Sequence, residues 1–373
     1  MPARVYLMAL NASGLSGVPR YTATLARALD AVNTDFPDLE LTLVTTSVGA
    51  ATVAPTAMSI WKVDLFGRRT SRGPVRLLLE QALAPMARAD VIHYFDVGGP
   101  FLAPRQPFVL TFHDAALRHP ELCHFGPLQR SYKQMLYPWS LSRARAIIAV
   151  SEFAKQEAVR YFGVEPRTIT VVHSGPGLTP LASGPTDRQT RRPYVLFVGS
   201  LTAGKNVPFL IRAFERSGVD ADLVLAGRPI EAVSMIEDMV RTSSVGGSIR
   251  LVLKPSDADL DRLYARAIAV VLPSLYEGFG FTSLEAMTRG CPVLASDIPA
   301  VREVSGTGAL LLPLEERAWA DAIRRVVAEP ELRASLIDRG RRTVERYSWE
   351  RTARGVCEVL LRVAAEGSPI SRH

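Results

Sequence analysis

Short apolar segments alternate with longer helical patterns along this chain of 373 residues, and this alternation constrains the fold more than any other feature. A helical pattern is clear over residues 18–32, where large apolar side chains recur every three or four positions. Strands that alternate with helices in this way form parallel sheets with helices packed on both faces. The chain is therefore predicted to have an α/β fold.

The predicted strands fall into two series. The first series is expected at Arg4–Leu10, Leu41–Thr45, Val91–Tyr94, Phe108–Thr111, Ala146–Val150 and Ile169–Val172. The second series is expected at Tyr194–Val198, Asp222–Ala226, Ile249–Leu253, Ala269–Pro273, Pro292–Ala295 and Gly308–Leu312. Each series predicts its own doubly wound, Rossmann-like sheet.

Residues 179–193 separate the two series, and they are rich in Pro, Ser, Thr and Arg with few large apolar side chains. Such a composition is typical of a linker between domains. We expect a first domain at residues 1–180, a linker at 181–193, a second domain at 194–348 and a last helical segment at 349–373. Because ligands of doubly wound sheets bind at the carboxyl ends of the strands, the expected site is a cleft where two such sheets face each other.

Composition and charge exclude several classes of protein. The cysteines Cys123, Cys291 and Cys357 are far apart and form no metal-binding or redox pair, which favours a reducing compartment. No apolar stretch approaches the ~20 residues that span a bilayer, and the short N-terminal apolar run lacks the pattern of a signal peptide. The formal charge of +7 is compatible with phosphorylated ligands, but no recognition motif for nucleic acid accompanies it.

A glycine-rich turn follows the first strand of the second series. Gly199 to Lys205 matches the letters of the phosphate loop of nucleoside triphosphatases, but Asn206 stands where that loop needs Ser or Thr for magnesium. A strand-to-helix turn with a lysine can still bind a phosphate through charge, backbone amides and the helix dipole. The structural alternative is an ordinary turn with a surface lysine.

A second glycine-interrupted loop runs from Pro273 to Met287 and leads into a helix expected to begin near Thr282. Glycines let the backbone approach a ligand closely, and the helix N-terminus favours an anion such as a diphosphate. Glu277 and Glu285 bracket the loop and can accept hydrogen bonds from sugar hydroxyls. The alternative for Glu285 is a capping box with Thr282, and for Glu277 a solvated loop acid.

Three further places follow strands of the first series. His113 and Asp114 are adjacent at a strand end, where the carboxylate can fix the histidine tautomer; the alternative is a pair that caps the next turn. His93 also ends a strand and is a weaker candidate. The loop from Gly14 to Gly17 has the wrong glycine spacing for a dinucleotide-binding fold but can wrap a phosphate or a sugar.

Taken together, these segments resemble the retaining glycosyltransferases of the GT-B fold, family 4 type, which include sucrose synthases and bacterial mannosyltransferases. The resemblance covers nearly the whole chain. Its segments, in order, are Gly14 to Tyr21, Thr111 to Asp114, Ile148 to Phe153, Val198 to Asn206, Pro273 to Met287 and Tyr347 to Glu350. The spacing of Glu277 and Glu285 within Pro-Ser-x-x-Glu-Gly-Phe-Gly is the most specific element.

The resemblance implies roles for individual residues. His113, Lys205 and Glu277 would be catalytic: the lysine would bind the donor diphosphate, Glu277 would hold the donor sugar, and the histidine would contact that sugar. Glu285 would hold the nucleotide ribose. The remaining contacts to the donor would come from backbone and small side chains at Gly17, Gly199, Ser200, Gly278, Phe279, Gly280 and Phe281. The last helix would return to pack on the first domain.

The chain departs from the family at the diphosphate site. Many relatives carry Arg directly after the strand glycine or directly before the lysine, whereas this chain has Ser200 and Gly204 there. Thr282 also stands where relatives often have Pro. One positive charge of the site is therefore missing, and another residue must supply it or the leaving group is held less tightly.

The resemblance implies transfer of a hexose, with mannose from GDP-mannose as first expectation, to an acceptor hydroxyl with retention of configuration. We expect no metal cofactor, because the Asp-x-Asp match at Asp257 and Asp259 lies at a predicted helix start where Asp caps the backbone. The rival hypotheses are a triphosphatase, a hydrolase or epimerase of the same fold, and a non-catalytic protein that binds nucleotide sugars.

The acceptor is expected to be a glycan, a lipid-linked sugar or a small molecule, and no nucleic-acid partner is expected. A mixed aromatic and basic segment of the first domain is a candidate for docking on anionic lipid, the alternative being an exposed arginine-rich segment. Its residues are Trp61, Lys62, Phe66, Arg68, Arg69, Arg72 and Arg76. We expect a cytoplasmic protein that can bind the inner face of the membrane peripherally.

Overall fold

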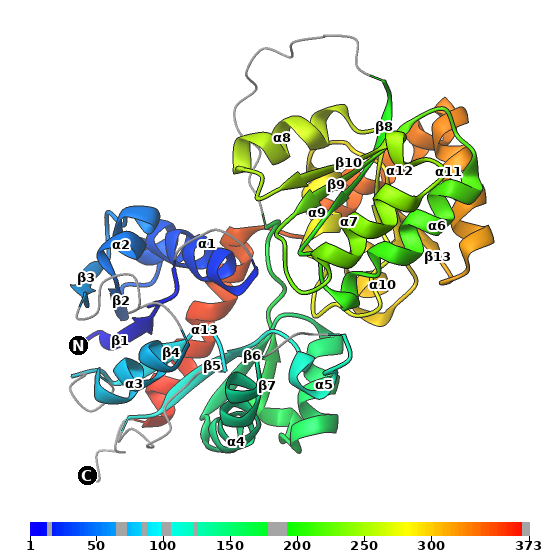
Figure 1. The fold of residues 1–373 in the computed structure, drawn as a ribbon. Helices are drawn as coiled ribbons and strands as arrows, with labels where there is room; N and C mark the ends of the chain where they lie inside the picture. The colour runs from blue at the N-terminus through cyan, green and yellow to red at the C-terminus, as the bar shows by residue number, and fades with distance from the viewer. Residues whose placement is uncertain are drawn as a thin grey trace. The chain divides into compact units, whose positions relative to one another are not determined.

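The computed structural model describes residues 1–12, 17–64, 73–83, 88–97, 106–122, 126–177 and 192–367. These residues divide into two compact units (Figure 1). Unit 1 holds the described residues within 1–118, 125–175 and 347–373, and unit 2 holds those within 119–124 and 176–346.

Unit 1 is built on a seven-stranded sheet with the order β3-β2-β1-β4-β5-β6-β7, in which every neighbouring pair is parallel. The strands are β1 (Ala3–Met8), β2 (Leu39–Thr45), β3 (Ser59–Lys62), β4 (Val91–Tyr94), β5 (Phe108–Phe112), β6 (Ala146–Ala149) and β7 (Ile169–Val171). The helices are α1 (Gly17–Val32), α2 (Ser47–Val53), α3 (Gly73–Leu83), α4 (Pro127–Arg143), α5 (Glu152–Phe162) and α13 (Trp349–Gly367).

Unit 2 is built on a six-stranded parallel sheet with the order β10-β9-β8-β11-β12-β13. Its strands are β8 (Tyr194–Val198), β9 (Asp222–Gly227), β10 (Ile249–Leu253), β11 (Ala269–Leu272), β12 (Val293–Ser296) and β13 (Ala309–Leu312). Its helices are α6 (Val207–Ser217), α7 (Val233–Thr242), α8 (Asp257–Arg266), α9 (Phe281–Thr288), α10 (Pro299–Ser305), α11 (Glu316–Ala328) and α12 (Pro330–Val344).

Short 3-10 helices complete the described chain. They are η1 (Asn33–Asp35), η4 (Ala116–Arg118) and η5 (Pro166–Thr168) in unit 1, and η6 (Ala203–Lys205), η7 (Gly246–Ser248) and η8 (Gly306–Gly308) in unit 2.

Both sheets have the doubly wound strand order, in which the first strand of the series lies in the interior and the order reverses beside it. The reversal falls between β1 and β4 in unit 1 and between β8 and β11 in unit 2. Loops that follow two such neighbouring strands diverge to opposite faces and leave a crevice for a ligand. The predicted fold class is confirmed, and the topology marks the place in each unit where a site is expected.

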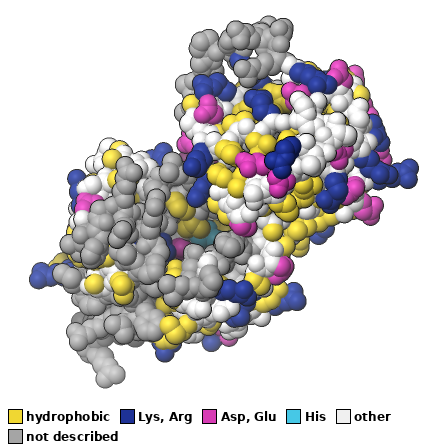
Figure 2. Space-filling model, viewed as in Figure 1, with side chains coloured by type: hydrophobic (Ala, Val, Ile, Leu, Met, Phe, Trp, Pro, Cys, Tyr) yellow, Lys and Arg dark blue, Asp and Glu magenta, His cyan; other side chains and the backbone are white. Residues whose placement is uncertain are grey.

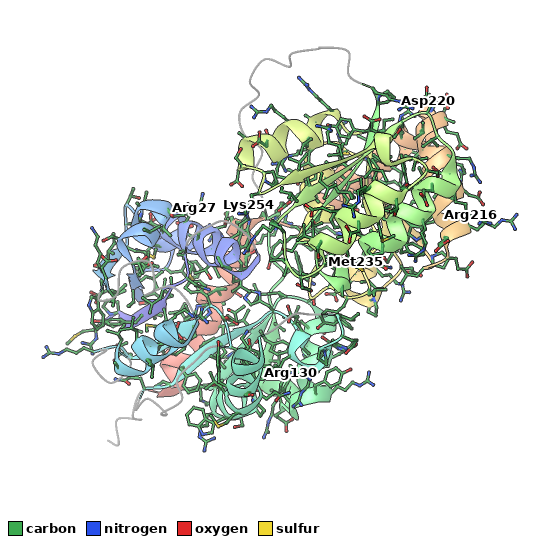
Figure 3. The ribbon with its side chains drawn as sticks, viewed as in Figure 1. Arg27, Arg130, Arg216, Asp220, Met235 and Lys254 are labelled. Carbon is green, nitrogen blue, oxygen red and sulfur yellow. The ribbon has the colours of Figure 1, made fainter. Side chains whose placement is uncertain are left out.

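Packing of α6 illustrates how the helices are held on the sheet of unit 2. Its apolar side chains face the core, where the ring of Phe209 lies 5.9 Å from that of Trp319 on α11, and Trp319 is completely buried. Arg216 of the same helix points to solvent (Figure 3). Burying a side chain as large as Trp319 stabilises the fold by roughly 3–5 kcal/mol relative to alanine.

The last helix, α13, belongs to unit 1, where it packs on α1, β1, β4 and β6. The hydroxyl of Thr352 donates a hydrogen bond to the carbonyl oxygen of His173 at 2.9 Å, and the Arg354 guanidinium pairs with Asp35 at 2.5 Å. The C-terminal segment therefore completes the core of the unit that contains the N-terminus.

The structure differs from the sequence-based predictions at two strands. The strand β3 has an exposed, mixed sequence at the sheet edge, so it lacks the apolar run by which buried parallel strands are found. The predicted strand Arg4–Leu10 ends earlier, at Met8. The expected linker, 181–193, lies outside the described residues except for its last two positions.

Charged side chains of both signs are interspersed over the face of unit 2 that Figure 2 shows. The same face also carries hydrophobic side chains between the charges. On this face of unit 2 the basic side chains are therefore not gathered into one surface.

One ion cluster of unit 1 is nearly buried. The Arg76 guanidinium lies 3.2 Å from Asp96 and 3.6 Å from Glu80, whose second carboxylate oxygen, Oε2, is buried without a hydrogen-bond partner among the described residues. Burial raises the pKa of Glu80 to about 7, because removing the ionised carboxylate from water outweighs the attraction of Arg76. Glu80 thus changes its charge near neutral pH.

This cluster predicts a pH dependence of stability. Between an unfolded pKa of about 4.5 and a folded pKa of about 7, the folded chain binds the extra proton, so the free energy of unfolding falls as pH rises through this window. Relative to a Glu80→Gln variant, the wild type should lose about 3 kcal/mol between pH 4.5 and pH 8.

The measurement is urea unfolding followed by tryptophan fluorescence, which reports mainly unit 1 because Trp61, Trp139 and Trp349 belong to it. Glu358→Gln, at an exposed position of α13, is the matched control and should leave the pH profile unchanged. Parallel profiles for the wild type and Glu80→Gln would contradict the assignment.

Candidate functional site

The strand order of unit 2 brings two loops together at the carboxyl ends of β8 and β11. Residues 199–206 follow β8 and residues 273–280 follow β11, and these two strands are neighbours at the reversal point of the sheet. The backbone N–H of Leu275 donates to the carbonyl oxygen of Gly204 at 2.8 Å and thereby joins the loops directly. The two loops singled out in the sequence therefore lie against each other.

Lys205 and Glu277 meet where these loops join. The ammonium of Lys205 contacts the Oε1 atom of Glu277, and the hydroxyl of Ser274 donates to the same oxygen at 2.8 Å. The two charged side chains are only 24% and 19% exposed, so both are fixed in position. Gly199 lies beside the lysine stem, since a Cβ at this glycine would be 3.8 Å from Lys205 Cδ.

The first loop turns sharply at its end. Lys205 is the last residue of the short helix η6, and Asn206 has a left-handed backbone with φ of 55° before α6 begins. Ser200 contributes its carbonyl oxygen to the turn by accepting the N–H of Thr202 at 2.9 Å. The asparagine that replaces the hydroxyl residue of a phosphate loop therefore has a backbone role here.

Gly280 directs the second loop into α9. Its φ of 96° is a conformation that favours glycine, and it is the N-cap of a helix that begins at Phe281. The ring of Phe279 is buried and lies 5.0 Å from that of Phe281, which fixes the turn that begins at Gly278. The positive end of the helix dipole thus lies at the end of the loop that carries Glu277.

The capping-box alternative for Glu285 is wrong. Helix α9 is capped by Gly280 without a side-chain hydrogen bond, and the carboxylate of Glu285 instead accepts the hydroxyl of Tyr264 from α8 at 2.8 Å. Glu285 is only 7% exposed, and a Cβ at Gly177 would lie 2.3 Å from its Oε1 atom. This carboxylate is a buried, oriented acceptor and not a helix cap.

An ion pair between Arg289 and Asp261 lies next to the ring of Tyr264. The guanidinium of Arg289 pairs with Asp261 at 2.7 Å, lies 5.1 Å from the centre of the Tyr264 ring and donates to the carbonyl oxygen of Glu285 at 3.0 Å. Helices α8 and α9 are therefore tied together around the carboxylate. Sequence reasoning missed Tyr264 because nothing in the local pattern of α8 distinguishes it from a core tyrosine.

His113 follows β5 in unit 1. Its Nε2 atom lies 2.8 Å from the carbonyl oxygen of Phe95, and because a carbonyl only accepts, this nitrogen carries the proton. In the neutral ring Nδ1 is consequently an acceptor for a hydroxyl group. The sequence left two interpretations open for Asp114, and the structure favours the turn cap, because its Oδ1 atom accepts the N–H of Ala116 at 2.9 Å.

The ring of Tyr21 supports His113. Tyr21 is 1% exposed, and its ring meets the histidine edge-on at 4.6 Å and that of Trp349 at 5.5 Å. Helix α1, the end of β5 and the start of α13 thus converge on one tyrosine. The sequence placed these three segments in one family pattern but not in one contact.

His93 is a core residue. It is completely buried, its Nε2 atom lies 3.0 Å from the hydroxyl oxygen of Thr111, and burial lowers its pKa to about 3. The ring is therefore neutral at physiological pH. The weaker of the two histidine candidates is therefore a buried residue of the core.

Two further predictions fall partly outside the described residues. Gly17 begins α1 with φ of 50°, whereas Gly14 and its neighbours at 13–16 are not described. In the aromatic and basic segment, Trp61 and Lys62 lie on β3, and residues 65–72 are not described. Arg76 does not suit docking on lipid, because its side chain is only 16% exposed and pairs with Glu80 and Asp96.

The remaining observations concern metals and membranes. Asp259 forms a capping box with Ser256 at the start of α8, as the sequence predicts for this Asp-x-Asp match. Across the described ranges, no group of three or more His, Cys, Asp or Glu side chains is placed to hold a metal ion. Within the same part of the chain, none of the helices is long and apolar enough to cross a membrane.

Two family models match the chain one after the other. Residues 15–176 match Glycosyltransferase Family 4, and residues 182–343 match Glycosyl transferases group 1. Each model therefore covers most of one of the two predicted halves.

Similar proteins and solved structures agree with the family models. O-antigen chain mannosyltransferase RfbU of Salmonella typhimurium is 28% identical over 60% of this chain, and the aligned part spans 61% of RfbU. O-antigen chain mannosyltransferase B of Escherichia coli is 27% identical over 75% of this chain and 78% of its own length. HepE of Anabaena, solved with UDP and glucose, has 18% identity and a TM-score of 0.72 over 97% of this chain and 100% of HepE, a likeness of fold.

The two family matches, the mannosyltransferase relatives and the two doubly wound sheets place the chain in one family. The chain belongs to the family 4 type of glycosyltransferases with the GT-B fold.

Proposed function

We propose that the chain transfers a hexose from a nucleoside-diphosphate sugar to an acceptor hydroxyl, with retention of the anomeric configuration, in the synthesis of a glycan or glycolipid. The observation that carries this proposal is the joined pair of loops in unit 2, where Lys205 and Glu277 are fixed beside the N-terminus of α9. Mannose is the first candidate sugar because two relatives are O-antigen chain mannosyltransferases.

The reaction needs stabilisation of a leaving diphosphate. As the bond between the anomeric carbon and the diphosphate oxygen breaks, negative charge grows on that oxygen. A fixed ammonium and the positive end of a helix dipole, aimed at this place, lower the barrier without having to reorganise. Lys205 and the first turn of α9 supply both, so we propose that the step requires no metal ion.

Glu277 and Glu285 are suited to the other parts of the donor. Carboxylates accept hydrogen bonds from sugar hydroxyls, and a carboxylate already held by Ser274 or Tyr264 loses little freedom when it does so. We assign Glu277 to the transferred sugar and Glu285 to the ribose. The Nδ1 atom of His113 is assigned to a hydroxyl of the transferred sugar.

Retention is assigned to displacement on one face of the sugar. The acceptor oxygen forms its bond to the anomeric carbon on the side from which the diphosphate leaves, and the acceptor's hydroxyl proton passes to an oxygen of the departing phosphate. The products are the glycoside and a nucleoside diphosphate. Anomeric configuration of the product, determined by NMR with an α-linked donor, tests this step, and a β-linked product would reject it.

Binding of nucleoside diphosphates is the first test. The wild type is mixed separately with GDP, UDP and ADP. At a concentration about a hundred times its dissociation constant, the nucleotide that the site prefers should raise the free energy of unfolding by about 2.7 kcal/mol, which is seen as a higher Tm. We expect GDP to give this stabilisation. UDP is the most informative comparison, because HepE was solved with it. A response to UDP alone would reject GDP-mannose as the donor, and no response to any base would reject the whole proposal.

Loss of the fixed charges should abolish turnover while the fold stays intact. Lys205→Ala and Glu277→Ala should each reduce kcat/KM roughly 10²–10³-fold, the cost typical of removing one group that stabilises the charge of a transition state. The assay is release of nucleoside diphosphate that depends on a pool of soluble and lipid-linked acceptors, with added EDTA as the test of metal independence.

Arg216→Ala, an exposed charge on α6 of the same unit, is the matched control and should retain full activity and the wild-type Tm (Figure 3). Near-normal turnover in both site variants would contradict the assignment. Release of nucleotide and free sugar without acceptor would instead favour a hydrolase, and binding without turnover on any acceptor would favour a non-catalytic protein.

A further inference from the structure

A short segment of the N-terminal half packs on the candidate site of unit 2. Residues 119–122, here called the strap, cluster with unit 2, although η4 before them and α4 after them belong to unit 1. The strap is a turn in which the N–H of Leu122 donates to the carbonyl oxygen of His119 at 3.0 Å. Its contacts fall on the two loops that carry Lys205 and Glu277.

The first contact is made by the backbone of Gly204. Its N–H donates to the carbonyl oxygen of Leu122 at 2.8 Å, and its own carbonyl oxygen accepts the N–H of Leu275 at 2.8 Å. The peptide units on both sides of Gly204 are thus held between the strap and the second loop. Lys205 is the next residue, so its Cα position depends on this line of hydrogen bonds.

The second contact is made by the ring of His119. It lies against the ring of Tyr276 with the centres 4.7 Å apart and the planes inclined by 38°. Tyr276 directly precedes Glu277, whose carboxylate contacts the ammonium of Lys205. The strap therefore touches the residue before each member of the charged pair.

The fit at Gly204 excludes a larger residue. A Cβ at this position would lie 2.6 Å from the carbonyl oxygen of Leu122, which is backbone and cannot move aside without displacing the strap. In this chain the room next to Gly204 is taken by the strap.

We propose that the strap is a positioning element of the donor site: the Leu122 carbonyl and the His119 ring hold the loops of Lys205 and Glu277 in the arrangement that binds the diphosphate. The inference rests on the proposed function for what is bound. The geometric part, that these two contacts order the two loops, stands on the structure of unit 2 alone. His119 and Leu122 act through other residues and touch no reacting atom.

The experiment compares variants that remove each contact. Gly204→Ala places a methyl group against the Leu122 carbonyl and should weaken it. His119→Ala removes the ring contact, and His119→Phe keeps an aromatic ring there. Arg216→Ala, which removes an exposed charge of α6, is the matched control and should leave both loop exchange and nucleotide affinity unchanged.

Two measurements are made on each variant. Amide hydrogen exchange of peptides covering residues 199–206 and 273–281 reports the order of the loops without any ligand. Titration calorimetry with the nucleoside diphosphate that stabilises the wild type reports the site. Gly204→Ala should speed exchange in both loops and weaken binding about tenfold, the effect of one lost hydrogen bond. His119→Ala should weaken binding about two- to tenfold, as expected for an aromatic contact, and His119→Phe should restore it.

The outcomes separate the two proposals. Unchanged exchange in Gly204→Ala and His119→Ala, or unchanged nucleotide affinity in both, overturns the inference. Faster exchange in a chain that binds no nucleoside diphosphate rejects the proposed function while the strap's effect on the two loops is retained. Equal losses in His119→Ala and His119→Phe overturn the part assigned to the ring.

Discussion

The contact between the ammonium of Lys205 and the carboxylate of Glu277 is the interaction on which the candidate site depends. The two residues are 72 positions apart, and they meet because β8 and β11 are neighbours where the strand order reverses. A lysine held in this way has a defined position at the end of a sheet, next to a helix N-terminus. A doubly wound sheet with any other pairing at this point would separate the two loops.

The doubly wound halves and the two loops could be predicted from the sequence because buried parallel strands appear as continuous apolar runs. The exposed edge strand β3 has no such run, and it was missed. The strap was also missed, since the turn at 119–122 resembles any connection between a strand and a helix. Its contacts with Gly204 and Tyr276 join residues about 80 and 160 positions apart in the chain, which no local pattern encodes.

The residues of the candidate site also differ in how well a local sequence pattern predicted their partners. A local pattern left two interpretations open for Glu285 and for Asp114, and the structure decides each by a single hydrogen bond. Glu285 fits a capping box with Thr282 by spacing, but the N-cap of the helix is Gly280, two residues earlier, and the hydroxyl of Tyr264 donates to the carboxylate. Asp114 is adjacent to His113, yet it caps its own turn, and the carbonyl oxygen of Phe95 fixes the ring. Adjacency in sequence was a poor guide wherever a partner came from a different element.

The exact position of Lys205 matters for the proposed reaction. Under the proposed function, stabilisation of the leaving diphosphate depends on how closely the Lys205 ammonium approaches it. At an effective dielectric constant of about 20, the attraction between unit charges falls from about 4 to about 3 kcal/mol when their separation grows from ~4 to ~6 Å. That difference corresponds to roughly a tenfold change in rate. Hydrogen bonds on both sides of Gly204 that prevent such a shift would therefore preserve this attraction.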